Sequence, residues 1–213
     1  MAYVLGYFAA DGAMMENSRG AHFIEFHSTD KHLIMTVRRA LSSNHKIGVC
    51  LRGLINPRHK TVYRLQIGSK EMFADLTAFG FVQNKSNSIR LPVIPSQYFG
   101  DFVRGYFDGD GCVYFKRLKF SDRKRMRWIL MNIFTSGSKA FLQDLHTALK
   151  RYNIKGGSIR NKNRGFDLSF SHHDSLALSH LMYDTGRANG LYLPRKYKLF
   201  QRAIQTLYGT LRA

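Results

Sequence analysis

The segment from Tyr3 to Gly12, YVLGYFAADG, corresponds closely to the segment from Phe102 to Gly111, FVRGYFDGDG. Both copies carry Gly-Tyr-Phe and then a small residue followed by Asp-Gly, and Asp11 and Asp110 stand 99 positions apart. That spacing is close to half of the 213-residue chain. An internal repeat at this distance predicts two structurally similar halves.

The residues after each copy correspond as well. Helical patterns follow in both halves, with Lys31 matching Lys139 and Leu41 matching Leu149. The strand-like stretches are 21–28, 47–52 and 62–67 in the first half and 128–135, 158–162 and 166–170 in the second. We therefore predict an α+β protein made of two tandem αββαββα repeats.

The boundary between the halves is expected at 84–100, where Ser and Asn residues accompany Pro92 and Pro95. We assign residues 1–83 to the first repeat, 84–100 to a linker and 101–213 to the second repeat. The second half also carries an insertion, KRLKFSDRKRMR, from Lys116 to Arg127. Such a basic run is either a solvated loop or an arm that contacts a polyanion, and the sequence leaves both open.

Small residues are spaced four apart in each copy, Gly6 and Ala10 in the first and Gly105 and Gly109 in the second. On a helix these residues lie on one face, so two such helices can approach more closely than usual. We expect Gly12 and Gly111 to end the two helices in the left-handed conformation. Asp11 and Asp110 would then lie side by side at the ends of two touching helices.

Two adjacent carboxylates repel each other, and the negative end of a helix dipole disfavours each of them further. A cation is needed to compensate. Carboxylate oxygens, with the backbone carbonyls of Ala10 and Gly109 nearby, suit a hard divalent ion such as Mg²⁺. A metal held by Asp11, Asp110, Ala10 and Gly109 beside a basic surface points to phosphodiester hydrolysis.

The charge of the chain is strongly one-sided, with 33 Lys and Arg against 14 Asp and Glu and a net charge of +19. Nucleic acid is the expected partner of such a chain. The apolar start lacks a basic leader, and no apolar run reaches the roughly 18 residues of a membrane span. Cys50 and Cys112 are interpreted as ordinary small apolar residues of a reducing, intracellular compartment. Organelle, bacterial and archaeal compartments are not distinguished.

The duplicated motif resembles the LAGLIDADG homing endonucleases in their single-chain form, and the resemblance covers nearly the whole chain. Residues 4–12 and 103–111 match the signature at its glycines and final acid, whereas its Leu, Ile and first Asp vary. The resemblance implies a pseudo-twofold pair of saddle-shaped antiparallel sheets that binds the major groove of a long, asymmetric duplex DNA target. It also implies that Asp11 and Asp110 bind Mg²⁺ or Mn²⁺ and each cut one strand, leaving staggered ends. Ca²⁺ would occupy the sites without supporting cleavage.

Members of that family also use basic residues near the metals to activate water. Lys162 aligns loosely with such a residue and is our third catalytic candidate, after Asp11 and Asp110. Lys85 and Lys196 occur in similar post-helix contexts and are accessory candidates.

Alternation along the expected strands identifies side chains that face away from the core. Arg64 and Gln66 alternate with apolar neighbours, and Arg and Gln suit bidentate contacts to guanine and adenine. Loop residues are expected to meet phosphates. The facing of 127–135, a nearly continuous apolar stretch, cannot be assigned from its period. The DNA-binding candidates are Glu25, His27, Arg52, Arg58, Lys60, Arg64, Gln66, Lys116, Arg123, Arg125, Arg127, Arg160, Lys162 and Arg164.

We therefore expect a monomeric, Mg²⁺-dependent, site-specific DNA endonuclease. The alternative is a non-cleaving protein on the same scaffold, either an intron maturase that binds RNA or a regulator that binds DNA. An intein-borne enzyme is less favoured, because the chain starts with neither Cys nor Ser and does not end in His-Asn. A ribonuclease or a ribosome-associated protein would not require the duplicated Asp-Gly helices.

Overall fold

A computed structural model describes residues 1–51, 60–119, 125–184 and 190–209. The first half contains α1 (Ala2–Asp11), β1 (Gly12–Glu16), β2 (His22–Ser28), α2 (Lys31–Ala40), β3 (Ile47–Cys50), β4 (Val62–Gly68) and α3 (Lys70–Ala78). The second contains α4 (Phe99–Asp110), β5 (Gly111–Leu118), β6 (Arg127–Ser136), α5 (Lys139–Leu149), β7 (Ser158–Lys162), β8 (Gly165–Ser171), α6 (His172–Tyr183) and α7 (Pro194–Tyr208). The predicted αββαββα order is confirmed in both halves, and α7 extends the second.

Short 3₁₀ helices lie in and around the connections. They are η2 (Lys85–Asn87) and η3 (Ser96–Tyr98) between the repeats, and η4 (Lys150–Tyr152) after α5. Three helices begin at side chains that accept backbone N–H bonds, Asp30 before α2, Ser69 before α3 and Ser138 before α5. These caps satisfy N–H groups that a helix start leaves without intrahelical partners.

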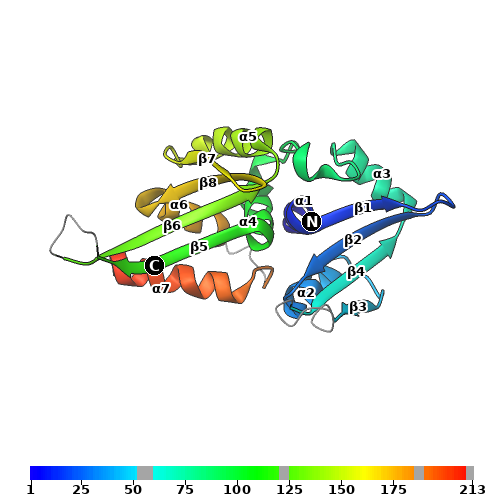
Figure 1. Ribbon diagram of the computed structural model, residues 1–213, viewed down its shortest axis with the longest axis horizontal. Coiled ribbons are helices and arrows are strands. Elements are labelled where there is room, and N and C mark those ends of the chain that lie inside the picture. The colour runs from blue at the N-terminus through cyan, green and yellow to red at the C-terminus, as the bar shows by residue number, and fades with distance from the viewer. Residues whose placement is uncertain (52–59, 120–124, 185–189, 210–213) are drawn as a thin grey trace.

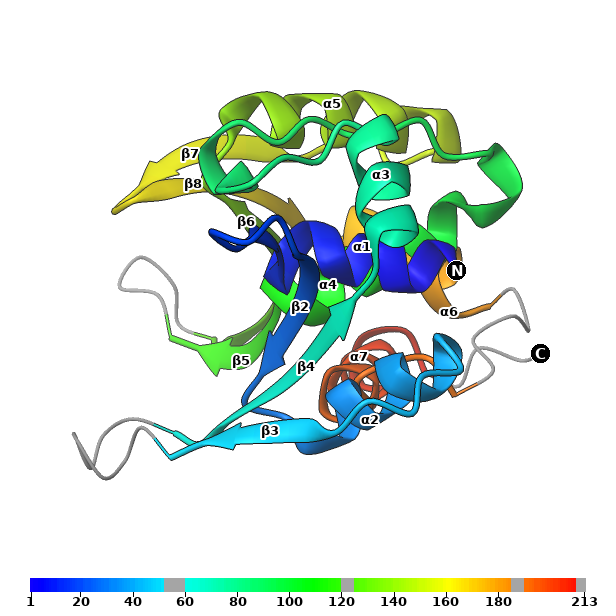
Figure 2. The same ribbon diagram turned by 90° about the vertical axis from the view of Figure 1, so that its right-hand side faces the viewer.

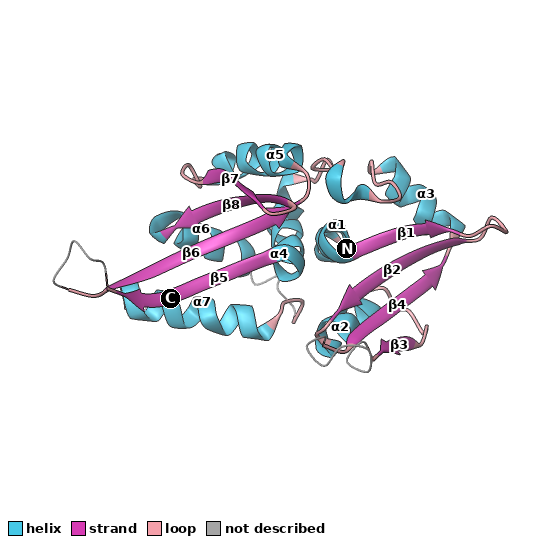
Figure 3. Cartoon of the chain, viewed as in Figure 1, coloured by secondary structure: helices cyan, strands magenta, loops and turns pink. Residues whose placement is uncertain are grey.

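Each half forms a four-stranded antiparallel sheet, and the two sheets have equivalent strand orders, β1-β2-β4-β3 and β5-β6-β8-β7. Gly12 pairs with Phe26 in the first sheet, and Gly111 pairs with Phe134 in the second. This shared register makes Phe26 and Phe134 equivalent positions. In Figure 1 the sheets lie side by side with α1 and α4 between them, and Figure 3 shows the same arrangement by secondary structure.

Helices cover one face of each sheet and leave the other face open. Figure 2 shows the strands mostly on the left and α2, α6 and α7 on the right. In β2 the buried Ile24 and Phe26 face the helices. In β6 the buried residues are Leu130, Asn132, Phe134 and Ser136. The burial pattern therefore assigns the facing of 127–135, which the sequence left open. Alternate residues of β6 lie on the open face, namely Ile129, Met131, Ile133 and Thr135.

The two central helices are tied to the sheets by equivalent contacts. The Tyr7 hydroxyl donates to the carbonyl of His27 at 2.6 Å, and the Tyr106 hydroxyl donates to the carbonyl of Thr135 at 2.8 Å. Phe8 packs edge-on against Phe26, as does Phe107 against Phe134. These duplicated contacts fix how each helix is placed on its own sheet.

The predicted left-handed conformation at the helix ends was wrong. Gly12 and Gly111 are extended, with φ of −89° and −96°, because each begins a strand directly after its helix. Cys50 and Cys112 are both free and exposed, and each lies on the open face of its sheet. Among the described residues, none of the helices is long and apolar enough to cross a membrane.

Candidate active site at the seam between the repeats

The contact between α1 and α4, here called the seam, is closer than ordinary helix packing because glycines form it. A Cβ atom on Gly6 would overlap the carbonyl oxygen of Phe102, and one on Gly105 would overlap that of Tyr3. A Cβ on Gly109 would lie 2.5 Å from the Cβ of Ala10. The predicted role of these small residues in bringing the two helix backbones together is confirmed.

The glycines that follow the helices serve the same close packing. A Cβ on Gly12 would lie 2.6 Å from Cγ of Phe8, and one on Gly111 would lie 2.6 Å from Cγ of Phe107. Neither glycine is required by its φ. Each is required because a phenylalanine ring of the preceding helix covers it.

The seam brings Asp11 and Asp110 together at the ends of α1 and α4. A Cβ on Gly109 of α4 would lie 3.3 Å from Oδ2 of Asp11, so the Asp11 carboxylate lies against the other helix. Burial, and next the charge of Asp110, raises the pKa of Asp11 to about 6. Burial also raises the pKa of Asp110, against the lowering effect of nearby lysines. The protein therefore holds two carboxylates in a place that disfavours their charge.

Lys85 and Lys196 lie buried beside these carboxylates, with exposed fractions of 4% and 5%. Lys85 Nζ donates to the carbonyl of Gly12 at 2.6 Å. Lys196 Nζ donates to the carbonyls of Phe107, Asp108 and Gly111 at 2.5, 2.9 and 2.6 Å. Burial lowers the pKa of each lysine to about 8. Both ammonium groups thus cap the negative ends of the two helices.

Lys162 occupies a different position, on the exposed end of β7. Its Nζ lies 3.3 Å from both Thr135 Oγ1 and Asp167 Oδ1. Its charge also lowers the pKa of Asp110. Lys162 is therefore near the second acid, although the side chains that it contacts directly are those of Thr135 and Asp167.

Asp108 is a third buried carboxylate near the seam. Its Oδ2 accepts hydrogen bonds from the Tyr3 hydroxyl at 2.9 Å and from the Leu193 backbone N–H at 2.8 Å. It therefore joins α4 to α1 and to the start of α7. One signal of this asymmetric role is visible in the sequence, since Ala9 stands at the matching position of the first copy.

The donor chemistry at the seam fits a divalent cation. Two carboxylates whose charge is disfavoured by burial gain from a cation between them. Ala10 and Gly109 lie in the last turns of α1 and α4, where carbonyls lack intrahelical partners. Within the described ranges, there is no group of three or more His, Cys, Asp or Glu side chains that could hold a metal. The remaining ligands would be carbonyls, water and phosphate oxygens, as is usual for Mg²⁺.

The predicted DNA-binding residues fall into three groups. Arg52, Arg58 and Arg123 lie outside the described residues. The exposed ones are Lys60, Lys116, Arg125, Arg127, Arg160, Lys162 and Arg164. His27, Arg64 and Gln66 are partly exposed, whereas Glu25 is buried beneath them with 4% of its surface exposed. The predicted outward facing of Glu25 is confirmed, but its carboxylate contacts His27, Arg64 and Gln66. Direct contact of Glu25 with DNA stays a prediction.

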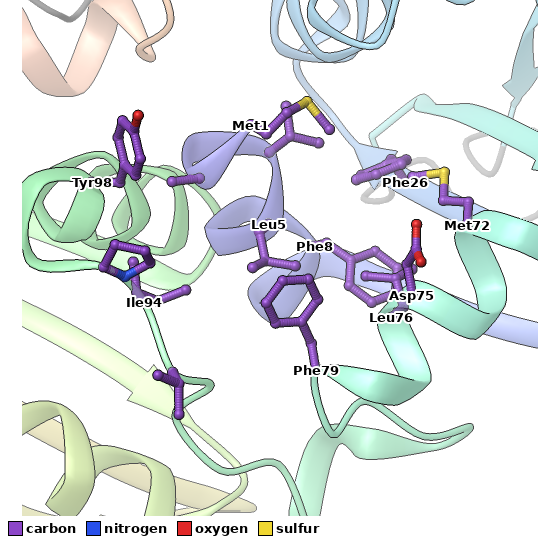
Figure 4. Close-up of a pocket in the computed structure, with 14 residues that line it drawn as sticks. Met1, Leu5, Phe8, Phe26, Met72, Asp75, Leu76, Phe79, Ile94 and Tyr98 are labelled. Atoms are coloured by element: carbon purple, nitrogen blue, oxygen red, sulfur yellow. The ribbon is translucent and has the colours of Figure 1, made fainter.

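An apolar cavity of about 260 Å³ lies between the first repeat and the linker, on the side of α1 that faces α3. Figure 4 shows Leu5, Phe8, Phe79 and Ile94 pointing into it. None of the predicted site residues is among the described residues that line it. The cavity is therefore separate from the seam.

A duplicated chain whose halves meet through two central helices, each ending in an acid, has a pseudo-dimeric architecture. The sequence matches the LAGLIDADG-like domain family twice, over residues 1–78 and 100–177. The chain therefore belongs to this family.

Solved structures of meganucleases share the fold. A lysine-to-alanine mutant of I-SmaMI is similar with a TM-score of 0.65 and 11% identity, over 97% of this chain and 92% of that chain. I-AabMI bound to uncleaved DNA gives 0.63 and 12%, over 97% and 90%. I-WcaI bound to its DNA recognition sequence gives 0.61 and 14%, over 93% and 84%. The predicted α+β fold, with two four-stranded antiparallel sheets and flanking helices, is confirmed.

One curated protein matches part of the sequence. A 76-residue segment is 36% identical to part of a probable translation initiation factor IF-2 from Thermococcus kodakarensis. The match covers 34% of this chain but only 6% of that protein. The chain thus corresponds to a small part of that relative's length.

Proposed function

We propose that this protein is a homing-type endonuclease that cuts both strands of a long, asymmetric duplex DNA site and leaves staggered ends. It acts as a monomer and depends on Mg²⁺, which Mn²⁺ can replace. The observation that carries the proposal is the pair of carboxylates, Asp11 and Asp110, that meet at the seam beside two buried lysines.

Three further observations support DNA as the substrate. The net charge of +19 favours a polyanion. The open faces of the two sheets carry Arg64, Gln66, Arg160 and Lys162, side chains that suit base edges and phosphates. Similar structures, such as those of I-AabMI and I-WcaI, contain bound DNA.

In the proposed mechanism, Asp11 and Asp110 would hold the divalent cation, together with the carbonyls of Ala10 and Gly109. The cation, when bound, would supply Lewis acidity that activates water. Lys85 offers two N–H donors beyond the one given to Gly12, and these can orient water or phosphate near the first acid. Lys162 supplies positive charge near the second acid. The two halves act on opposite strands because the seam relates them by a pseudo-twofold axis.

The proposal is tested by selection from a randomised duplex library in the presence of Mg²⁺, with recovery and sequencing of cleaved ends. We expect enrichment of one long, asymmetric sequence that is cut on both strands. Parallel selections in EDTA and in Ca²⁺ should yield no cleaved ends. The double variant Asp11→Asn/Asp110→Asn should also yield none.

Binding to the enriched duplex without cleavage in Mg²⁺ or Mn²⁺ would overturn the nuclease assignment in favour of a non-cleaving DNA regulator. Preferential binding to structured RNA would favour a maturase. Cleavage that persists in EDTA would contradict the role of the metal.

A further inference from the structure

A buried carboxylate lies on the open face of the first sheet, where a polyanion is expected to bind. Glu25 belongs to β2 and alternates with Ile24 and Phe26, which face the core. Its side chain therefore points to the open face. Yet only 4% of its surface is exposed, because the side chains of His27, Arg64 and Gln66 contact its carboxylate. Burial of an ionised carboxylate is costly unless other groups satisfy it.

Each of the covering side chains contacts the Glu25 carboxylate. Oε1 accepts hydrogen bonds from Gln66 Nε2 at 2.7 Å and from Arg64 Nη1 at 3.4 Å. Oε2 lies 2.8 Å from His27 Nε2. The strand register explains the arrangement, since Glu25 stands opposite Gln66, and His27 stands opposite Arg64. We call Glu25, His27, Arg64 and Gln66 the Glu25 cluster.

These contacts determine which polar groups remain for a ligand. Only the amide nitrogen of Gln66 can donate to a carboxylate, so the orientation of the amide is fixed. Its oxygen and second N–H are left for another partner, and this pair of groups matches adenine in the major groove. Arg64 is anchored through one nitrogen and keeps its other donors for guanine or phosphate. The side chain of Arg64 is 41% exposed and that of His27 is 34% exposed.

The Glu25 cluster has little net charge, so it is better suited to base recognition than to phosphate binding. The carboxylate of Glu25 balances the guanidinium of Arg64, so the cluster adds little net attraction for the DNA backbone. Exposed lysines such as Lys60 are better suited to that task. The Glu25 cluster is thus built to present fixed hydrogen-bonding groups and not to supply charge.

We propose that Glu25 is a positioning residue for sequence readout, which holds Gln66, Arg64 and His27 in the orientations that meet base edges in one half of the target. This inference rests on the proposed function. Glu25 pairs with Ala13, two residues after Asp11, so the base pairs concerned adjoin the cleavage centre and not the outer end of the target.

The second repeat provides an internal control. Because Phe26 and Phe134 are equivalent in register, Ile133 stands at the position of Glu25 and Ser169 at that of Gln66. Loss of Glu25 should therefore alter base preference in one half of the target and leave the other half unchanged.

The test compares base preferences after selection from the randomised duplex library, using wild type, Glu25→Gln and the matched control Glu16→Gln. Glu16 is an exposed acid on β1 of the same sheet, so its substitution makes the same change in net charge. For Glu25→Gln we expect discrimination to fall at least about tenfold at one to three base pairs beside the cleavage centre, the range that one good base contact supplies. Glu16→Gln should keep the wild-type profile.

A second arm uses Gln66→Ala and Arg64→Ala, which alter partly exposed side chains and leave the core intact. These variants should lose preference at the same base pairs as Glu25→Gln. This arm decides the question even if Glu25→Gln lowers the melting temperature too far for selection. If Gln66→Ala and Arg64→Ala keep the wild-type profile, the cluster does not read sequence and the inference is wrong.

The remaining outcomes distinguish the inference from the function on which it rests. If Glu25→Gln only raises affinity for all sequences equally, as Glu16→Gln would, Glu25 contributes charge alone and the inference is overturned. Altered preferences in both halves of the target would overturn it as well. If wild type enriches no sequence by binding or cleavage, the proposed function itself fails and the inference falls with it.

Discussion

The two helix ends that deliver Asp11 and Asp110 are near copies, but their surroundings differ. At the end of α1, Lys85 gives one of its three N–H donors to Gly12. At the end of α4, Lys196 gives all three to backbone carbonyls. Lys162 then stands near Asp110, whereas the equivalent register position in the first repeat is Cys50.

Some features of the molecule are the same in both repeats, and others differ between them. The seam glycines, the acids and the tyrosine contacts to the sheets occur in both halves, and they fix where the carboxylates lie. The lysines and the open sheet faces differ, and we propose that they set the local chemistry. The Glu25 cluster lies on the open face of the first sheet, whereas Met131 and Ile133 lie on the open face of the second sheet. We therefore expect a shared geometry of cleavage but unequal treatment of the two strands and of the two half-sites.

The largest expected effect comes from removing either acid. Asp11→Asn and Asp110→Asn should each slow cleavage of at least one strand by roughly 10³-fold, since each removes a charged metal ligand. Binding to the duplex should be largely retained. Asp11→Asn should also raise the melting temperature, because folding disfavours the charge of a carboxylate with a raised pKa. Strand-resolved gels and thermal unfolding measure these effects.

The matched control for the acids is Asp75→Asn, which removes an exposed acid of α3. It should cut both strands at the wild-type rate. Undiminished double-strand cleavage by either seam variant would remove that acid from the site.

Substitution of the seam glycines tests the close contact between α1 and α4, to which both repeats contribute. Gly6→Ala and Gly105→Ala should each lower the free energy of unfolding by about 3 kcal/mol, because the new Cβ meets a backbone carbonyl that cannot move aside. The control Gly48→Ala, whose Cβ would find its nearest neighbour at 3.7 Å, should change it by less than about 0.5 kcal/mol. Urea unfolding measures the free energy of unfolding of all three variants. If Gly6→Ala and Gly105→Ala lose as little stability as Gly48→Ala, the close packing of α1 against α4 is contradicted.

Substitution of Lys85 and Lys196 tests the difference between the ends of α1 and α4. Lys196→Met should lower the free energy of unfolding by about 2 kcal/mol, since it leaves three carbonyls without their donor. Lys85→Met should lower it less but slow cleavage by roughly 10²-fold, the usual contribution of one positioned hydrogen-bond donor. Each variant serves as the control for the other. Equal losses of stability from both would show that the two helix ends are alike.

The smallest expected effect concerns a buried position at which the cores of the two repeats differ. Asn132 is fully buried, and within the described residues neither of its side-chain polar atoms has a hydrogen-bond partner. Ile24 stands at the equivalent position of the first repeat. Asn132→Leu, which has a similar shape, should raise the free energy of unfolding by about 1 kcal/mol. The exposed Asn161→Leu should leave it unchanged, and a loss of stability in Asn132→Leu would show that the amide is satisfied in solution.

Much of this architecture could be predicted from the sequence because the repeat carries it. The spacing of Gly6, Ala10, Gly105 and Gly109 predicted the close helix contact, and alternation predicted the faces of β2 and β4. Long-range contacts could not be predicted in this way. The burial of Glu25 depends on partners about forty residues away on β4, and the role of Asp108 depends on Tyr3 and Leu193. The extended Gly12 and Gly111 were missed because a helix that passes directly into a strand needs no left-handed residue.

The most direct test of the composite site is a crystal structure of the protein bound to its selected duplex in Ca²⁺, which should occupy the metal site without allowing cleavage. We predict Ca²⁺ at the seam, bound by Asp11 and Asp110 and by phosphate oxygens of the two strands. Carboxylates that lie far apart, or that face away from the DNA, would contradict the account.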